Sequence, residues 1–354
     1  MPSRRNSIGH MSRRAFGAMV GGFAVVAASN ARAQKLDVVK VGLTNVATDI
    51  GLFVANKRGY FRDEGLDVQF TTFDSAARMM APFASGELDV SAGAPSAGFF
   101  NAVGRGIDMR IVADKVSTPP GRPSQTLVVR KALVDSGRFK TLADLKGLKF
   151  ANTAPGTAAW GTMYRILERA GLKPSDVDLV SLSFPQQVIA LANGAIDVAL
   201  PAEPMTTEAV TKGYGVKVIT DDEVFPNHQI AVIFYSGKFA NERAPAARKF
   251  MKAFLRGVRD HNDGLDEKGM FTGEKGEAII AILNEYTSIK NPAFYRSFPL
   301  AFCNPDGTVN VESIKQDFAA FKAAGFITSN IDPMKGIDLS FLEAALKELG
   351  PYKK

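Results

Sequence analysis

The sequence predicts an α/β protein of two similar lobes with mixed, mainly parallel sheets, joined by a two-strand hinge. The first observation behind this prediction is an internal repeat at an offset of roughly 108 positions, too long for a solenoid unit. Gly86–Val90 (GELDV) returns as Gly194–Val198 (GAIDV), and Gly65-Leu66 returns as Gly171-Leu172. A repeat of this length indicates two related α/β units that face each other.

The second observation is the alternation of strand-like and helix-like segments. Short apolar runs predict strands at Val38–Leu43, Gly65–Phe70, Asp89–Ala92 and Met109–Ala113. Longer segments between them predict helices at 50–61, stopped around Gly59, at 76–84, and from Pro95-Ser96 to about 103. Strands that alternate with helices predict a mainly parallel sheet.

The third observation concerns the connections between the lobes. Lys115–Ser124 is rich in Pro and Gly and predicts the first crossing, and apolar runs at 125–130 and 229–235 bracket the second repeat. We therefore predict lobe one as 34–124 plus 235–354, and lobe two as 125–234. Helical periodicity after residue 246 predicts amphipathic covers for lobe one, at 246–259, 274–285, 311–324 and 338–349.

Residues 1–33 resemble an export signal. They contain five arginines and no acidic residue, then an apolar run at 18–28 and the small-residue segment Ala31-Arg32-Ala33. The pair Arg13-Arg14 is similar to a twin-arginine signal, so we expect cleavage after about Ala33 and a periplasmic destination. The alternative is an amphipathic anchor that stays attached.

Composition excludes several classes of function. The net charge of +7 comes mainly from the leader, so nothing predicts a nucleic-acid partner. Cys303 is the single cysteine, which excludes an intramolecular disulfide. Outside the leader only His228 and His261 remain, without metal-ligand spacing, and no nucleotide-binding glycine motif occurs. We therefore predict no metal, no cofactor and no catalytic residue.

Ligands of open parallel sheets bind beyond the carboxyl ends of the strands, where loops lead into helices. Applied to both lobes, this rule selects five segments: Asn45–Asp49, Gly93–Ser96, Thr153–Trp160, Phe184–Gln187 and Pro201–Met205. The candidate ligand-binding residues within them are Asn45, Thr48, Asp49, Pro95, Ser96, Thr153, Gly156, Thr157, Ala158, Gln186 and Glu203.

The strongest candidate is the loop that starts the helix after Asn152. Its small residues expose backbone N–H groups at the positive helix end, which suits an anion, although Thr157 could be an N-cap only. Pro95-Ser96 repeats this arrangement in the other lobe. Glu203 could meet a ligand amine or an arginine across the crevice. Trp160 could stack on a ligand or lie in the core, and His228 could serve the hinge or the ligand. His261 is expected to be solvated.

Three segments carry a resemblance to a known family. Gly59–Val68 (GYFRDEGLDV), Thr141–Ala151 (TLADLKGLKFA) and Ile337–Leu346 (IDLSFLEAAL) resemble the solute-binding proteins of nitrate, sulfonate and taurine-type ABC importers. That resemblance implies a type II periplasmic binding fold with two Rossmann-like lobes, and a monomer that delivers a small solute to an inner-membrane permease. The same fold group includes pyrimidine-precursor binders and enzymes of thiamine biosynthesis.

The hypothesis from sequence is a periplasmic binding protein that captures a small anionic solute, a sulfonate, nitrate or carboxylate, between closing lobes. The rival is an enzyme related to thiamine pyrimidine biosynthesis, with His228 or Glu203 as acid or base. A third reading is a sensory binding subunit that docks on a receptor.

Overall fold

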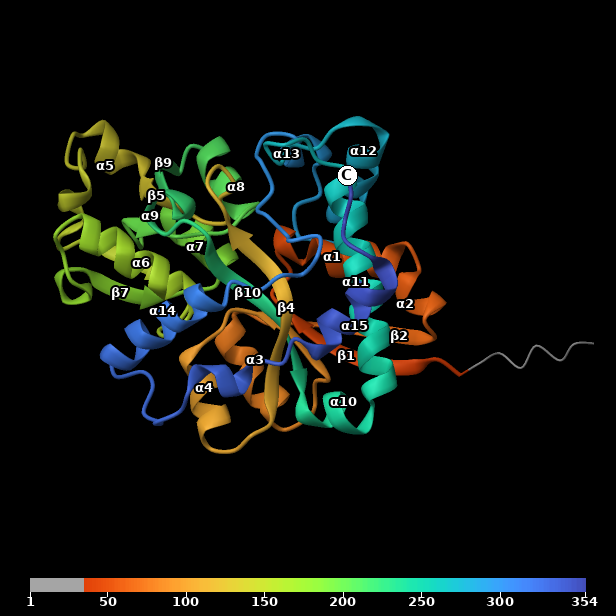
Figure 1. The fold of residues 1–354 in the computed structure, drawn as a ribbon. Coiled ribbons are helices and arrows are strands. Elements are labelled where there is room, and N and C mark those ends of the chain that lie inside the picture. The colour runs from red at the N-terminus through yellow and green to blue at the C-terminus, as the bar shows by residue number, and fades with distance from the viewer. Residues whose placement is uncertain (1–34) are drawn as a thin grey trace, which may run out of the picture. The chain divides into compact units, whose positions relative to one another are not determined.

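The computed structural model describes residues 35–354, and the predicted leader at 1–33 lies outside the described residues. The chain forms two five-stranded sheets, with orders β2-β1-β3-β10-β4 and β7-β6-β8-β5-β9 (Figure 1). The fold is thus α/β with two mixed sheets, as predicted from the sequence.

The two sheets repeat one topology. In each, three neighbouring strands are parallel, and the fourth is antiparallel to both of its neighbours. Val90 in β3 and Val198 in β8, equivalent by sequence, occupy the same place in their sheets. The strands are β1 Asp37–Leu43, β2 Leu66–Thr72, β3 Val90–Gly93, β4 Met109–Thr118, β5 Thr126–Arg130, β6 Lys149–Asn152, β7 Asp178–Ser181, β8 Val198–Ala199, β9 Gly215–Thr220 and β10 His228–Ser236.

Helices surround both sheets. With the first sheet lie α1 Ile50–Lys57, α2 Tyr60–Asp63, α3 Ala76–Ala84, α4 Ala97–Gly104, α10 Gly237–Glu242, α11 Ala244–Asp263, α12 Gly273–Tyr286, α13 Pro292–Tyr295 and α15 Ser340–Leu349. With the second lie α5 Lys131–Asp135, α6 Ala158–Arg169, α7 Phe184–Ala192, α8 Met205–Thr211 and α9 Asp221–Val224. Helix α14 spans Val311–Ala323, and the 3₁₀ turns are η1 Ala47–Asp49, η2 Leu142–Leu145, η3 Pro174–Asp176 and η4 Pro333–Gly336. None of the helices within 35–354 is long and apolar enough to span a bilayer.

The helix predicted at 50–61 is two helices. Gly59 between α1 and α2 has φ +80°, a left-handed conformation that glycine adopts without the steric cost of a Cβ. Helix α11 then packs against α1, α12 and α15. Its Phe250 stacks on Phe61 with ring centroids 4.9 Å apart, in the core beside the first sheet. Both helices on either side of the break at Gly59, α1 and α2, therefore pack on α11.

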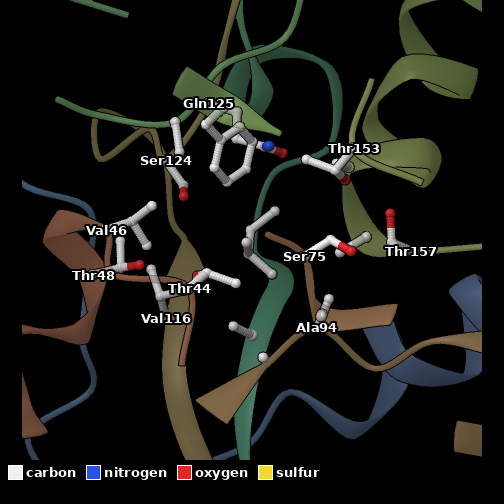
Figure 2. A pocket seen from close by; sticks show the side chains of 18 of the residues that line it. Thr44, Val46, Thr48, Ser75, Ala94, Val116, Ser124, Gln125, Thr153 and Thr157 are labelled. Atoms are coloured by element: carbon white, nitrogen blue, oxygen red, sulfur yellow. The ribbon is translucent and has the colours of Figure 1, made fainter. Parts of the chain in front are cut away.

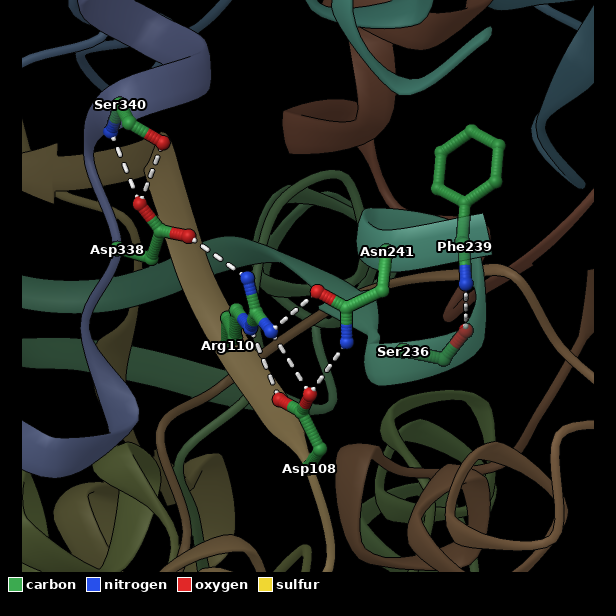
Figure 3. Close-up of polar contacts among 7 residues, drawn as sticks. All are labelled: Asp108, Arg110, Ser236, Phe239, Asn241, Asp338 and Ser340. Carbon is green, nitrogen blue, oxygen red and sulfur yellow. Dashed lines mark hydrogen bonds and ion pairs between the residues drawn. The ribbon is translucent and has the colours of Figure 1, made fainter. Parts of the chain in front are cut away.

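Polar contacts fix the N-terminal end of β4 to α10 and to the start of α15 (Figure 3). Arg110 donates two hydrogen bonds of 2.8 Å to the Asp108 carboxylate, one of 2.8 Å to Asn241 in α10, and one of 3.0 Å to Asp338. Asp338 in turn accepts from Ser340, the first residue of α15. The guanidinium lowers the pKa of Asp108, so this network is charge-assisted.

Two crossovers, 119–125 and 221–227, connect the lobes. They are tied to each other: Asp222 accepts from Gly121 N at 2.7 Å, and Asp221 accepts from Ser124 N at 3.0 Å and Gln125 N at 2.9 Å. Asn227 N also donates to Thr118 O at 2.7 Å. The two connections are therefore one hydrogen-bonded unit.

Two details differ from the expectation. Residues 228–234, which we placed in lobe two, belong to β10, which pairs with β3 and β4 in the first sheet. The helix predicted as a cover for lobe one, α14, also packs on α6 of lobe two, where Phe321 meets Trp160 edge-on. Apolar periodicity identifies a buried face, but it does not say which neighbour buries that face.

Candidate functional site

A cavity of about 60 Å³ lies where the two lobes and the crossovers meet (Figure 2). Both lobes contribute to its wall, together with Ser124 and Gln125 of the first crossover. The lining residues are Thr44, Val46, Thr48, Ser75, Ala76, Gly93, Ala94, Lys115, Val116, Ser124, Gln125, Thr153, Thr157, Ala158, Ala159, Phe184, Ala202, Ile230 and Ala231. Its size suits a small molecule or a few waters.

Hydroxyl groups face the cavity from every side. Those of Thr44, Thr48, Ser75, Ser124 and Thr153 have no hydrogen-bond partner among residues 35–354. Figure 2 shows these side chains among the residues that line the cavity. Polar groups in a closed site need partners, so a molecule bound there has donors and acceptors available on all sides.

Two helices point their N-termini at the cavity, one from each lobe. In α6, Ala158 and Ala159 line the wall and their backbone N–H groups have no partner within the described chain. The Thr157 hydroxyl does not cap this helix but donates to Ala154 O at 2.9 Å. In α3, Ser75 at the N-cap makes no capping bond either. Uncapped N-termini carry partial positive charge and bind anions.

One ion pair borders the cavity. Lys115 Nζ lies 2.6 Å from Asp49 Oδ1, and the side chains are 3% and 0% exposed. The other Asp49 oxygen accepts from Val46 N at 2.9 Å, which fixes the turn that carries Val46 and Thr48. Lys115 is the only charged residue on the wall formed by the described chain.

Asp221 positions the two crossover residues of the wall. Its carboxylate accepts the backbone N–H groups of Ser124 and Gln125, while the Gln125 side chain donates to Leu200 O at 3.4 Å. The side-chain oxygen Oε1 of Gln125 is buried without a hydrogen-bond partner in the described structure. Burial raises the pKa of Asp221 to about 7, although the two backbone donors act in the opposite direction.

Backbone contacts across the cleft flank the cavity on two sides. Ala97 N, at the start of α4, donates to Gly156 O at 2.8 Å, and Ala47 N donates to Glu203 O at 3.4 Å. Each bond joins lobe one to lobe two. The lobes are therefore in contact around the cavity, which is the closed arrangement of a two-lobed site.

Each of the five segments selected from the sequence contributes to the wall. Of the individual candidates, Thr48, Thr153, Thr157 and Ala158 line the cavity. The remaining seven lie outside the wall and have other contacts or conformations: Asn45, Asp49, Pro95, Ser96, Gly156, Gln186 and Glu203.

Those seven residues mostly support the wall from behind. Asn45 has φ +58° and turns the chain after β1. Ser96 accepts from Phe99 N and caps α4, and Gln186 accepts from Ser183 and caps α7. Glu203 accepts from Thr207 and Lys217 inside lobe two, where burial raises its pKa. Its backbone, not its carboxylate, reaches across the cleft.

Three further residues have defined positions. Trp160 is buried, stacked on Tyr164 and edge-on to Phe321 and Phe326, so it belongs to the core and not to the wall. His228 is a buried hinge residue that bonds Asp317 at 2.8 Å and lies 3.4 Å from the Thr162 hydroxyl. The expectation for His261 is wrong: it is buried, which lowers its pKa to about 3.

The sequence reasoning missed several wall residues. The strand-end rule selects loops that follow strands, whereas Lys115 lies within β4, Ser124 and Gln125 lie in the first crossover, and Ile230 lies in the antiparallel strand β10. Ser124 and Gln125 directly follow the Pro-Gly-rich stretch that marked the first crossing. A rule that added crossover residues to the strand ends would have found both.

Fold and site together define a two-lobed α/β protein with a small-molecule cavity between its lobes. The chain belongs to the NMT1-like family, whose family model matches residues 32–263.

Curated and solved proteins agree with this class. An Escherichia coli (strain K12) protein described as an aliphatic sulfonates-binding protein is 27% identical over 177 residues, half of this chain and half of that protein. The nitrate-binding protein NrtA from Synechocystis PCC 6803 is similar with a TM-score of 0.72, 14% identity, and coverage of 89% and 90% of the two chains. The alkanesulfonate-binding protein SsuA from Xanthomonas axonopodis pv. citri, solved with MOPS, is similar with a TM-score of 0.68, 17% identity, and coverage of 86% and 99% of the two chains.

These structural likenesses concern the fold. The relatives compared above are binding proteins, and the structural neighbours have the two-lobed periplasmic binding fold. The desulfurization enzyme DSZB shares the fold more distantly, with a TM-score of 0.58 and 13% identity. The fold alone therefore does not separate binding from catalysis.

Proposed function

We propose that this chain is the exported solute-binding component of an ABC importer, and that it captures a small anionic solute of the sulfonate, nitrate or carboxylate class. The observation that carries the proposal is the cavity, where unpartnered hydroxyls of both lobes meet the uncapped N-termini of α3 and α6. Both features donate hydrogen bonds to oxyanions. The bound solute would then pass to an inner-membrane permease.

Closure of the lobes gives the binding mechanism. A ligand that contacts both lobes has higher affinity for the closed state, and this difference drives the lobes together. Thr44, Thr48 and Ser75 contribute from lobe one and Thr153 from lobe two, so the ligand bridges the cleft. Closure also removes water from the ligand, which strengthens every hydrogen bond it makes.

The test is a thermal-shift and calorimetric screen of the purified protein with methanesulfonate, nitrate, acetate, aromatic acids and pyrimidines. Binding to the folded state raises the melting temperature in a concentration-dependent manner. We expect an anion to bind, and Thr153→Val to weaken it by about 1 kcal/mol with little change in the unliganded melting temperature. Binding of pyrimidines alone would contradict the anion assignment.

The rival function is an enzyme, favoured by the likeness to DSZB. Against it, the wall within residues 35–354 carries one ionisable side chain, Lys115, which is already paired with Asp49. The sequence-based acid-base candidates lie elsewhere, because His228 is bonded to Asp317 and Glu203 to Thr207. Mass spectrometry of the bound solute after release decides between them: recovery unchanged supports binding, and a product supports catalysis.

Export and assembly complete the proposal. We propose a twin-arginine signal cleaved after about Ala33, a periplasmic location and a monomeric state. N-terminal sequencing of the protein from the periplasmic fraction tests the cleavage site, and replacement of Arg13-Arg14 by lysines is expected to prevent export. Light scattering of the mature protein tests the monomer. Delivery to a receptor in place of a permease is tested by solute uptake in a strain that lacks the gene.

A further inference from the structure

We infer that the buried pair Asp49–Lys115 sets the charge class of the ligand, so that the site accepts monoanions and rejects dianions. This inference rests on the proposed function, because it concerns the same cavity. It assigns a selectivity role to two residues, one on the wall and one directly behind it.

The geometry places a neutralised cation at the cavity. Lys115 reaches the wall from β4, near the start of the first crossover, and its Nζ is held 2.6 Å from Asp49 Oδ1. Asp49 belongs to η1, whose neighbours Val46 and Thr48 also line the wall. The charge of Lys115 is therefore cancelled where a ligand would meet it.

The other ionisable groups near Lys115 do not line the cavity. Asp114 is adjacent in sequence and buried, with its oxygens bonded to Gln229 Nε2 at 2.5 Å and Asn304 N at 2.9 Å. Cys303 is also buried, and burial raises the pKa of its thiol to about 12, so it stays neutral. Arg122, a further cation near Cys303, donates to Leu300 O at 2.8 Å and does not line the cavity. The charged side chains on the wall and directly behind it, Lys115 and Asp49, thus sum to zero.

The attraction for an anion then comes from helix ends and hydroxyls alone. An N-terminus contributes roughly half an elementary charge, and α3 and α6 both point at the cavity. One negative charge is matched by these dipoles. A second charge would be taken out of water with nothing to compensate it, which is costly in a closed site.

A matched pair of probes tests this selectivity in the wild-type protein. Methanesulfonate and sulfate share a tetrahedral sulfur oxyanion; in sulfate a fourth oxygen replaces the methyl group and adds one negative charge. We expect calorimetry at pH 7.5 to give at least about tenfold tighter binding of methanesulfonate, from Coulomb estimates at a partly buried site. Equal or tighter binding of sulfate would overturn the inference and leave the anion-binding function intact. Failure of every anion in the screen would overturn both.

Two variants assign the selectivity to the pair. Asp49→Asn removes the neutralising charge and keeps an oxygen for Val46 N. The affinity for sulfate should therefore rise at least about tenfold relative to the affinity for methanesulfonate. The double variant Asp49→Asn/Lys115→Met also sums to zero charge, so it should prefer methanesulfonate as the wild type does. A purely structural role for the pair predicts equal losses for both probes in both variants, and that result would overturn the inference. If Asp49→Asn does not fold, the wild-type ratio and the double variant still decide.

Discussion

Single buried carboxyls give this protein a pH dependence that surface composition does not reveal. Asp114 is buried in β4 and accepts hydrogen bonds from Gln229 and Asn304, and burial raises its pKa to about 7. Asp108 is part of the exposed network around Arg110, which lowers its pKa. The pKa of an aspartate side chain is therefore raised at one position in β4 and lowered at another directly before this strand.

The first prediction concerns the unfolding free energy of Asp114→Asn. Because the folded pKa is above the unfolded value of about 3.8, the Asp114 contribution is neutral below pH 4 and becomes unfavourable as pH rises toward 7. The loss amounts to as much as about 4 kcal/mol. Urea unfolding at pH 4.5, 5.5, 6.5 and 7.5 should therefore show that the unfolding free energy of the variant increases relative to that of the wild type with each step.

Asp108→Asn is the matched control for that measurement. Its lowered pKa gives a contribution that is present above the unfolded pKa and is lost only as pH falls below about 4. Between pH 5 and 7 the unfolding free energy of Asp108→Asn should change with pH in parallel with that of the wild type. If Asp114→Asn also runs parallel, the Asp114 carboxyl is ionised in the folded protein throughout this range.

At the scale of elements, the start of α6 brings the backbone itself to the ligand. Thr157 has φ −116° and ψ 168°, an extended conformation that a following proline requires. Proline is well tolerated at the first helical position, which is Ala158. The substitution Ala158→Pro therefore removes one N–H group from the cavity wall without breaking the helix.

The second prediction is that Ala158→Pro lowers the affinity for methanesulfonate by about tenfold or more, which is the contribution of one charge-assisted hydrogen bond. Its unliganded melting temperature should stay within a few degrees of the wild type. Ala158→Gly is the control, since it keeps the N–H and lowers helix propensity by about 1 kcal/mol. Calorimetry that gives the same affinity for Ala158→Pro and wild type would exclude this N–H as a ligand donor.

The elements also show what could be predicted from sequence. Alternation of apolar residues located the strands because burial on one or both faces of a sheet leaves that pattern. It could not assign β10 to a sheet, since all nine of its residues are buried and a strand buried along its whole length fits either lobe. The strand-end rule located the five wall segments, but Ser75, Lys115 and Gln125 become neighbours of the cavity only through tertiary packing.

At the scale of the whole molecule, closure depends on a close approach between lobes that only small residues permit. A Cβ on Gly156 would lie 2.8 Å from Ala97 Cβ and 3.4 Å from Phe326 Cβ. Ala97 and Gly156 also make the hydrogen bond across the cleft, from Ala97 N to Gly156 O. Any side chain at position 156 would therefore hold the lobes apart at this contact.

The third prediction compares Gly156→Ala with Gly171→Ala. Both glycines have positive φ, +65° and +72°, so both substitutions carry a similar backbone strain of about 1–2 kcal/mol. A Cβ at Gly171 meets nothing within 4 Å, so only Gly156→Ala obstructs closure. Calorimetry should show weaker ligand binding for Gly156→Ala alone, and small-angle scattering should show that its ligand-induced decrease in radius of gyration is reduced or absent.

A rescue separates obstruction of closure from local damage to the loop. Gly156→Ala combined with Ala97→Gly removes the opposing methyl group, so the lobes can approach again while the strain at position 156 remains. We expect the double variant to recover most of the lost affinity and compaction, with a melting temperature no higher than that of Gly156→Ala, because glycine near a helix start adds no stability. If affinity stays low in the double variant, the loss comes from distortion of the loop that leads into α6, and the contact between Ala97 and Gly156 does not control closure.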